Sequence, residues 1–362
     1  MEKRIHNFNA GPSVLPVEVL KDVQANLLNY KGYGLSVMEM SHRSAEYQKI
    51  IDDATAMLIK IMGLGDDYEV LFLGGGATTQ FLMLAMNLIR DGQEGNYVNT
   101  GTWATSALKE AKKIGKGMHI AASSEDKDFT FIPKEVKLSA NPAFLHTTSN
   151  NTIRGTEYQA DPVVPKGVKL VCDMSSNFLS RPYDFTKYDL IYAGAQKNIG
   201  PAGVTVVIIR KSIVDQFNDN LPTMMDYRTH IKKGSMHNTP PAFNIYVVGE
   251  VLKWIDAFGG LDKVHAHNVK KANYVYNAID NSNGFYKGTV AKEDRSLMNV
   301  TFRLGSEDLE KKFISEAKAA GMIGLKGHRS VGGCRASIYN SCPLESAKAL
   351  GEFMVKFAAD NK

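Results

Sequence analysis

A lysine and an acid stand near the ends of two successive apolar segments of this 362-residue chain. Lys197 lies in Ala-Gly-Ala-Gln-Lys-Asn, between the apolar runs 188–193 and 204–209. Asp173 directly follows the apolar run 168–172. A lysine that forms a Schiff base needs a dry, rigid setting, and an acid at a strand end can keep a pyridine nitrogen protonated. The pair therefore suggests pyridoxal phosphate chemistry, although a single lysine after a strand is more often a surface cation.

A glycine-rich loop precedes both residues. Gly-Gly-Gly-Ala-Thr-Thr-Gln at 74–80 follows an expected strand at 69–73 and opens an expected helix at 79–90. Glycines let the backbone approach a ligand, and free N–H groups at a helix start bind phosphate. The loop is neither a Walker A motif nor Gly-x-Gly-x-x-Gly. Alone it also fits a tight turn, so its value lies in supplying a phosphate cup upstream of Asp173 and Lys197.

Two further side chains follow expected strands. Trp103 comes just after the strand 95–99, where an aromatic ring can stack on a planar ligand in the sheet crevice. Thr152, in Ser-Asn-Asn-Thr-Ile-Arg-Gly, can hydrogen-bond a cofactor oxygen. A tryptophan in the core and a simple polar turn are the ordinary alternatives.

Basic groups gather at three places: His42-Arg43, His328-Arg329 and Arg335. Arginine binds carboxylates and phosphates through two parallel hydrogen bonds, so these positions favour an anionic substrate. Any one of them alone is more often a solvated surface charge. Two separate His-Arg pairs, each beside a serine, suit a distal phosphate or carboxylate, and Arg335 suits an α-carboxylate.

The pattern of elements predicts an α/β fold with a largely parallel sheet. Short strands alternate with amphipathic helices between residues 16 and 260, and Thr239 and Pro240 are expected to cap and open a helix ending at Phe258. A smaller α+β region follows. We therefore expect an N-terminal segment near the active site (1–15), a large cofactor-binding domain (16–260) and a small C-terminal domain (261–362). The expected strands are 69–73, 95–99, 118–121, 143–147, 168–172, 189–193, 204–209, 297–304 and 335–339.

Composition narrows the class of protein. Hydrophobic residues make up 44% of the chain, and the formal charge is a modest +5. The charges are mixed along the chain, which disfavours a nucleic-acid-binding protein. Neither a secretory leader nor a membrane span is expected. The three cysteines form no Cys-x-x-Cys pair, which argues against a disulfide framework or a zinc site and favours the cytoplasm.

Several long motifs, in register over essentially the whole chain, resemble the phosphoserine aminotransferase family, of class V and fold type I. The motifs are Phe-Asn-Ala-Gly-Pro at 8–12, Ser-Val-Met-Glu-Met-Ser-His-Arg at 36–43, residues 192–203 around Lys197, Gly-Ser-Met-His-Asn-Thr-Pro-Pro at 234–241, Lys-Gly-His-Arg at 326–329 and Arg-Ala-Ser-Ile-Tyr-Asn at 335–340. The resemblance implies the fold of pyridoxal-phosphate-dependent transferases, with a mostly parallel seven-stranded sheet. It also implies a homodimer with shared active sites, and phosphoserine, glutamate and 2-oxoglutarate as substrates.

The resemblance also implies a role for each candidate residue. Lys197 would carry the cofactor, Asp173 would meet its pyridine nitrogen, and Trp103 would stack on its ring. The remaining assignments are Thr152 at the 3-hydroxyl, Ala77, Thr78 and Gln196 at the cofactor and its phosphate, Asn238 and Thr239 at that phosphate from the neighbouring subunit, Arg335 at the substrate α-carboxylate, and His42, Arg43, His328 and Arg329 at the distal phosphate or carboxylate. No metal ligand is implied.

One departure and three alternatives remain. Some family members carry an arginine in the glycine loop, where this chain has Ala77-Thr78-Thr79, so the partners of the substrate phosphate stay open. Another class V enzyme, such as an alanine-glyoxylate-type aminotransferase, is one alternative. A cysteine desulfurase using Cys334 is the second, and it would need an exposed, activated thiol. A nucleic-acid-binding protein that retains the fold is the third.

Overall fold

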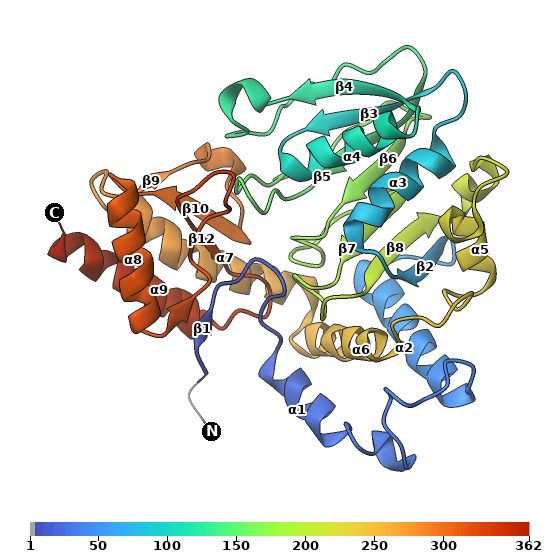
Figure 1. Ribbon diagram of the computed structural model, residues 1–362, viewed down its shortest axis with the longest axis horizontal. Helices are drawn as coiled ribbons and strands as arrows, with labels where there is room; N and C mark the ends of the chain where they lie inside the picture. Colours follow the sequence, from blue (N-terminus) through green and yellow to red (C-terminus); the bar gives the residue numbers. More distant parts are fainter. Residues whose placement is uncertain (1–3, 362) are drawn as a thin grey trace.

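The computed structural model describes residues 4–361 and shows two lobes built on separate sheets (Figure 1). The larger lobe holds a seven-stranded sheet in the order β2-β8-β7-β6-β5-β3-β4. Only β8 runs antiparallel to its neighbours in this sheet. The strands are β2 (Tyr68–Leu73), β3 (Glu94–Asn99), β4 (Gly117–Ser123), β5 (Pro142–Thr148), β6 (Lys169–Asp173), β7 (Leu190–Gly194) and β8 (Thr205–Arg210).

Helices cover both faces of the large sheet, as its nearly continuous apolar strands require. On one face α2 (Ala45–Met62) and α6 (Ala242–Ala257) pack against alternate strand residues such as Cys172 and Ile191. On the other face α3 (Gly76–Leu88) and α4 (Thr102–Lys113) pack against Val171 and Tyr192. The short helix α5 (Tyr227–Lys232) joins the second face, and α1 (Val17–Ala25) lies beside α6.

The smaller lobe is built from the C-terminal third of the chain. The antiparallel strands β9 (Lys287–Gly288), β10 (Asn299–Arg303) and β12 (Cys334–Ser337) form its sheet. The helices α7 (Gly260–Asp280), α8 (Glu307–Ala319) and α9 (Leu344–Asp360) enclose a core rich in phenylalanine. The N-terminal strand β1 (His6–Asn7) pairs with β11 (Met322–Ile323), so the start of the chain is tied to this lobe. Short 3-10 turns occupy Tyr30–Gly32, Glu125–Lys127, Phe185–Lys187, Lys211–Gln216, Thr223–Met225 and Lys292–Asp294.

The α/β class and the mostly parallel sheet are confirmed, and each expected strand has a counterpart within a few residues. The three domain limits remain a prediction. The expected start of α6 is wrong: the helix begins at Ala242, with Pro241 at the N-cap and no side-chain cap. A residue before a proline is disfavoured in the helical region, so Pro240, which precedes Pro241, cannot open the helix. Among the described residues, no helix has the length and apolar character needed to cross a membrane.

The glycine loop bends sharply into α3. Gly75 is the N-cap of α3 and has φ of 87°. A Cβ atom at Gly75 would lie 2.1 Å from the Thr79 hydroxyl oxygen, which instead donates to the Gly75 carbonyl at 2.9 Å. At the neighbouring Gly74 no heavy atom lies within 4 Å of such a Cβ, and its φ is not positive.

We therefore expect Gly75→Ala to lower the free energy of unfolding by about 2 kcal/mol, because left-handed backbone and the contact with Thr79 both oppose a side chain. Gly74→Ala is the matched control and should change it by less than about 0.5 kcal/mol. Urea denaturation of the cofactor-free chain measures both. Equal losses for the two variants would contradict this account of the loop.

Candidate active site

The candidate residues converge at one edge of the large sheet. Parallel strands bring their carboxyl ends together, and ligands bind in the crevice beyond those ends in open α/β sheets. Asp173 ends β6, and Lys197 lies three residues after the end of β7. Thr152 and Trp103 follow β5 and β3 in the same way. Trp103 and Lys197, which are 94 positions apart in the sequence, thus come to one site because the four strands run in one direction.

Lys197 lies between a hydroxyl and an aromatic face. Its Nζ donates to the Thr152 Oγ1 at 3.0 Å and lies 5.6 Å from the centroid of the Trp103 ring. Burial lowers the pKa of Lys197 to about 8, opposed by the negative charge of Asp173 and assisted by the positive charge of Arg335. A substantial fraction of this amine is therefore neutral near physiological pH, as a nucleophile or general base requires.

Asp173 is almost fully buried, with 5% of its surface exposed. Burial raises its pKa, while Lys197 and the hydrogen bond from the Ser175 backbone N–H, at 2.9 Å, act in the opposite direction. The Ser175 hydroxyl in turn accepts from the Gly194 N–H at the end of β7. Asp173 is therefore held by the Ser175 N–H, Ser175 is itself bound to the end of β7, and Lys197 is the cation that acts to lower the pKa of Asp173.

The N-terminal segment lies over the lysine loop. Ser13 donates from its hydroxyl to the Lys197 carbonyl at 2.5 Å and from its N–H to the Gln196 carbonyl at 3.0 Å. A Cβ on Gly11 would lie 3.4 Å from the Lys197 side chain. The Ala10 carbonyl accepts from the Tyr339 hydroxyl at 2.7 Å. The segment around Gly11 and Ser13 therefore lies beside Lys197.

The glycine loop and the segment before α6 share a cavity of about 520 Å³. Gly74, Gly75 and Thr79 line one side, and Asn238 and Thr239 line the other. Ala77 and Thr78 lie in the first turn of α3, whose backbone N–H groups have no partner within the helix. The resemblance implied that Asn238 and Thr239 serve a neighbouring subunit, and the structure also brings them close to the glycine loop of their own chain.

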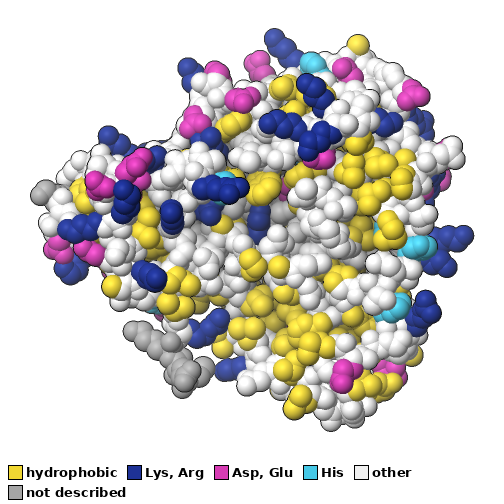
Figure 2. Space-filling model, in the orientation of Figure 1, with side chains coloured by type: hydrophobic (Ala, Val, Ile, Leu, Met, Phe, Trp, Pro, Cys, Tyr) yellow, Lys and Arg dark blue, Asp and Glu magenta, His cyan; other side chains and the backbone are white. Residues whose placement is uncertain are grey.

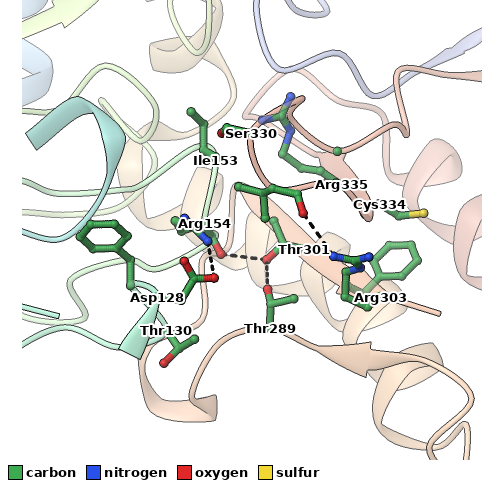
Figure 3. Close-up of a pocket in the computed structure, with 15 residues that line it drawn as sticks. Asp128, Thr130, Ile153, Arg154, Thr289, Thr301, Arg303, Ser330, Cys334 and Arg335 are labelled. Carbon is green, nitrogen blue, oxygen red and sulfur yellow. Dashed lines mark hydrogen bonds and ion pairs between the residues drawn. The ribbon is translucent and has the colours of Figure 1, made fainter. Parts of the chain in front are cut away.

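Arg335 connects the two lobes. From β12 it donates to the Thr152 carbonyl at 3.3 Å, and its Nε is buried without a partner in the described part of the chain. Burial lowers its pKa. Arg335 also lines an inter-lobe cavity of about 390 Å³, where Figure 3 shows Asp128 and Arg154 on one side and Arg303 on the other. Arg154 pairs with Asp128 and Arg303 with Glu310, so Arg335 is the arginine there without a carboxylate partner in residues 4–361.

The two His-Arg pairs occupy different places. His328 lies in the loop before β12, near enough to Arg335 and Arg329 that both cations help to lower its pKa, after burial. Its Nδ1 contacts the Ser330 hydroxyl at 2.7 Å. His42 and Arg43 precede α2, and within residues 4–361 no hydrogen bond or ion pair joins their side chains to this cluster. Arg329 and Arg335 thus act on His328 through their charges, whereas no hydrogen bond or ion pair in the described part of the chain links the side chains of His42 or Arg43 to this group.

Cys334 does not suit a desulfurase. Its side chain is 2% exposed within the core of the small lobe, and burial raises the pKa of the thiol. A desulfurase needs an accessible thiolate. The described residues also contain no cluster of three or more histidine, cysteine or acidic side chains placed to hold a metal ion.

Sequence reasoning missed several residues that build the site. Ser13 directly follows the motif at 8–12 and Tyr339 lies inside the motif at 335–340, but spacing alone does not reveal that they contact Lys197 and Ala10. Asn151 holds the loop before Trp103, because its Nδ2 donates to the Thr100 hydroxyl at 3.1 Å. His146 and Tyr192, which lie in apolar strand segments, gave no signal other than being polar residues within a strand.

Comparisons with known proteins agree with this geometry. The model of the aminotransferase class-V family matches residues 5–350. A phosphoserine aminotransferase from Desulfatibacillum aliphaticivorans is 55% identical over 100% of both chains. The solved phosphoserine aminotransferase from Bacillus circulans subsp. alkalophilus is 52% identical, covers 99% of each chain and superposes with a TM-score of 0.97. A PLP-bound phosphoserine aminotransferase from Trichomonas vaginalis is 38% identical, covers 97% of this chain and 99% of its own, and has a TM-score of 0.92.

The pKa of Lys197 provides a test of the site. The rate at which an amine-reactive reagent labels Lys197 in the cofactor-free chain should rise with pH through about 8, because only the neutral amine reacts. Asp173→Asn should shift this midpoint to lower pH, since the negative charge of Asp173 favours the protonated amine. Peptide mapping by mass spectrometry measures the rate. Glu69→Gln, a carboxylate paired with Lys211, is the control, and a wild-type midpoint near 10.5 would contradict the burial argument.

Proposed function

Since this chain belongs to the class-V aminotransferase family, we propose that it transfers an amino group between O-phospho-L-serine and 2-oxoglutarate, giving 3-phosphohydroxypyruvate and L-glutamate. The observation that carries the proposal is Lys197, an amine of lowered pKa held beside Asp173 and in front of Trp103. Full-length similarity to phosphoserine aminotransferases supports the choice of substrates. 4-Phosphohydroxythreonine is a second candidate substrate under this proposal, because it carries an α-carboxylate and a phosphate as phosphoserine does.

The residues at the sheet edge suit pyridoxal phosphate. Asp173 is a buried acid whose pKa the charge of Lys197 acts to lower, and the Trp103 Nε1 is buried without a partner in residues 4–361. Asp173 would face the pyridine nitrogen, Trp103 the ring and Thr152 the 3-hydroxyl. Ala77, Thr78, Gln196, Asn238 and Thr239 would hold the phosphate end. When bound, pyridoxal phosphate supplies the electron sink that makes the α-proton of an amino acid labile.

Lys197 would carry both the covalent attachment and the proton. Thr152 holds its Nζ at 3.0 Å, on the side of the Trp103 ring. The Lys197 amine would take the proton from the substrate α-carbon, and a base with a pKa of about 8 is well matched to this transfer near neutral pH. Asp173, in its ionised form, would stabilise positive charge at the pyridine nitrogen of the cofactor.

Arg335 would bind the α-carboxylate that both amino-acid substrates share. It lies next to Thr152, so a carboxylate on Arg335 places the α-carbon near Lys197. His328 and Arg329 extend this positive region toward the distal phosphate or carboxylate. From the family resemblance, His42 and Arg43 would complete the pocket from the other subunit of a homodimer.

An exposed apolar surface supports the homodimer. Leu28, Tyr33 and Met38 are 85%, 48% and 60% exposed in the segment that leads to His42 and Arg43. Figure 2 shows hydrophobic side chains gathered over the lower part of the molecule, where Figure 1 places α1, α2 and α6. Apolar patches of this kind mark protein–protein interfaces. A dimer formed through this surface would bring His42 and Arg43 toward the partner's site.

We further propose a cytoplasmic location. Cys172, Cys334 and Cys342 are free and buried. Free cysteines are the usual state in a reducing compartment.

A coupled assay tests the proposed reaction. The wild-type chain should turn over phosphoserine with 2-oxoglutarate, and Lys197→Ala should reduce this turnover by about 10³-fold or more while losing the borohydride-reducible link to the cofactor. Lys211→Ala, which removes an exposed lysine beside β8, is the control. Faster turnover of alanine with glyoxylate than of phosphoserine would refute the substrate assignment, and full activity of Lys197→Ala would refute the mechanism.

Mixed dimers test the shared site. Lys197→Ala and Arg43→Ala should each be weakly active alone, because each lacks one part of every site. When the two chains are co-expressed under different tags and the mixed dimer is isolated, one site regains both Lys197 and Arg43, so activity should return to about half of the wild-type value. No recovery in the mixed dimer would show that Arg43 serves the Lys197 of its own chain.

A further inference from the structure

Two aromatic side chains lie beside Asp173 on the same face of the large sheet. The register pairs Asp173 of β6 with Tyr192 of β7 and with Thr148 of β5. His146 precedes Thr148 by two residues, so it shares that face. Asp173 is 5% exposed, and His146 and Tyr192 are fully buried. None of the roles proposed above uses His146 or Tyr192.

A hydrogen bond joins the two rings. The His146 Nε2 lies 2.8 Å from the Tyr192 hydroxyl oxygen, and the rings stack with centroids 6.0 Å apart. Burial lowers the pKa of His146 to about 3, so this imidazole is neutral at physiological pH. Burial likewise raises the pKa of Tyr192, so its phenol keeps its proton. Each of the two neutral rings therefore has one polar hydrogen that it can donate.

Only one arrangement of these protons leaves the Tyr192 hydroxyl free to donate to Asp173. A neutral imidazole carries its proton on Nδ1 or on Nε2. If Nδ1 carries it, Tyr192 must donate its own proton to His146, and a buried N–H donor is left at Nδ1, which has no partner within residues 4–361. If Nε2 carries it, His146 donates to the Tyr192 oxygen and the Tyr192 proton is free to point to Asp173. The second arrangement avoids the buried unpaired donor.

Tyr192 is in a position to use that proton. Side-chain hydrogen bonding from Tyr192 acts to lower the pKa of Asp173, together with Lys197 and the N–H and hydroxyl of Ser175. Lys197 lies on the cofactor side and Ser175 on the loop after β6, whereas Tyr192 and His146 approach from within the sheet. A carboxylate that accepts more hydrogen bonds stays ionised more readily.

We propose that His146 and Tyr192 are positioning residues: the His146 Nε2–H donates to the Tyr192 oxygen, and the Tyr192 hydroxyl donates to Asp173 and holds this carboxylate ionised and oriented toward the pyridine nitrogen. The proposal rests on the proposed function only for the identity of the group that Asp173 faces. The hydrogen-bond chain itself belongs to the protein and exists without the cofactor. No proton is transferred along these hydrogen bonds, because His146 and Tyr192 each keep the proton that they donate.

Tyr192→Phe removes the hydroxyl that donates to Asp173 and, with it, the oxygen that accepts from the His146 Nε2–H. The pKa of the Asp173 carboxyl should rise by about one unit, since one charge-assisted hydrogen bond is lost. A ¹³C NMR titration of the cofactor-free chain, with the Asp173 signal assigned from Asp173→Asn, measures it. Tyr97→Phe is the matched control, because the Tyr97 ring packs against the same His146 ring, with centroids 5.3 Å apart, and its buried hydroxyl has no partner among residues 4–361.

His146 variants separate positioning from packing. His146→Gln keeps an N–H donor and should leave the pKa of Asp173 close to the wild-type value, whereas His146→Leu should raise it as Tyr192→Phe does. In the holoenzyme, Tyr192→Phe and His146→Leu should lower kcat by about tenfold with little change in KM, because neither residue reaches the substrate. The ¹⁵N shift of labelled cofactor should move toward the unprotonated ring in these two variants.

The outcomes are distinct from those of the activity assay. An Asp173 pKa that is unchanged in Tyr192→Phe, or that moves equally in Tyr97→Phe, would overturn the proposal. Equal effects of His146→Gln and His146→Leu would overturn the role of the Nε2–H. If the chain failed to act on phosphoserine while the pKa of Asp173 still rose in Tyr192→Phe, the substrate assignment would fall and the hydrogen-bond chain would stand.

Discussion

The structure depends on holding an amine and a carboxylate together away from water. Burial lowers the pKa of Lys197 and raises that of Asp173, so each group loses part of its preference for the charged form, and each charge partly restores the other. A buried pair of this kind costs free energy that its surroundings must offset. The surrounding hydrogen bonds from Ser175 and to Thr152 supply part of that offset. The resulting amine is reactive near neutral pH because it is not fully solvated.

Keeping this pair dry requires segments from three distant parts of the chain. The N-terminal segment covers the lysine loop through Ser13 and is itself tied to the small lobe by β1 and by the Tyr339–Ala10 hydrogen bond. The small lobe reaches the same loop through the Asn340 N–H, which donates to Asn198. A change in the packing of the two lobes would therefore alter the contacts of the loop that carries Lys197. The environment of Lys197 therefore depends on contacts from the N-terminal segment, the large lobe and the small lobe together.

The sequence predicts what local pattern controls and fails where contacts are remote. Apolar runs located the strands of the large sheet, and the polar residues at their ends located Asp173, Lys197 and Trp103, because parallel strands bring their ends together. The start of α6 was mispredicted because a capping threonine looked favourable and the restraint that Pro241 places on Pro240 was overlooked. Ser13 and Tyr339 could not be assigned roles, since their partners lie 184 and 329 residues away.

The same geometry explains why a substrate with two anionic groups suits this site. Lys197 belongs to the large lobe and Arg335 to the small lobe, so a carboxylate on Arg335 places a ligand across the boundary between them. Arg154 and Arg303 nearby are already paired with acids, which leaves Arg335, His328 and Arg329 to meet further negative charge. After burial, the positive charges of Arg335 and Arg329 also lower the pKa of His328, and repulsion among these groups is relieved when an anion binds. A ligand with a single carboxylate relieves only part of it, and a second anionic group at the distal end relieves the rest.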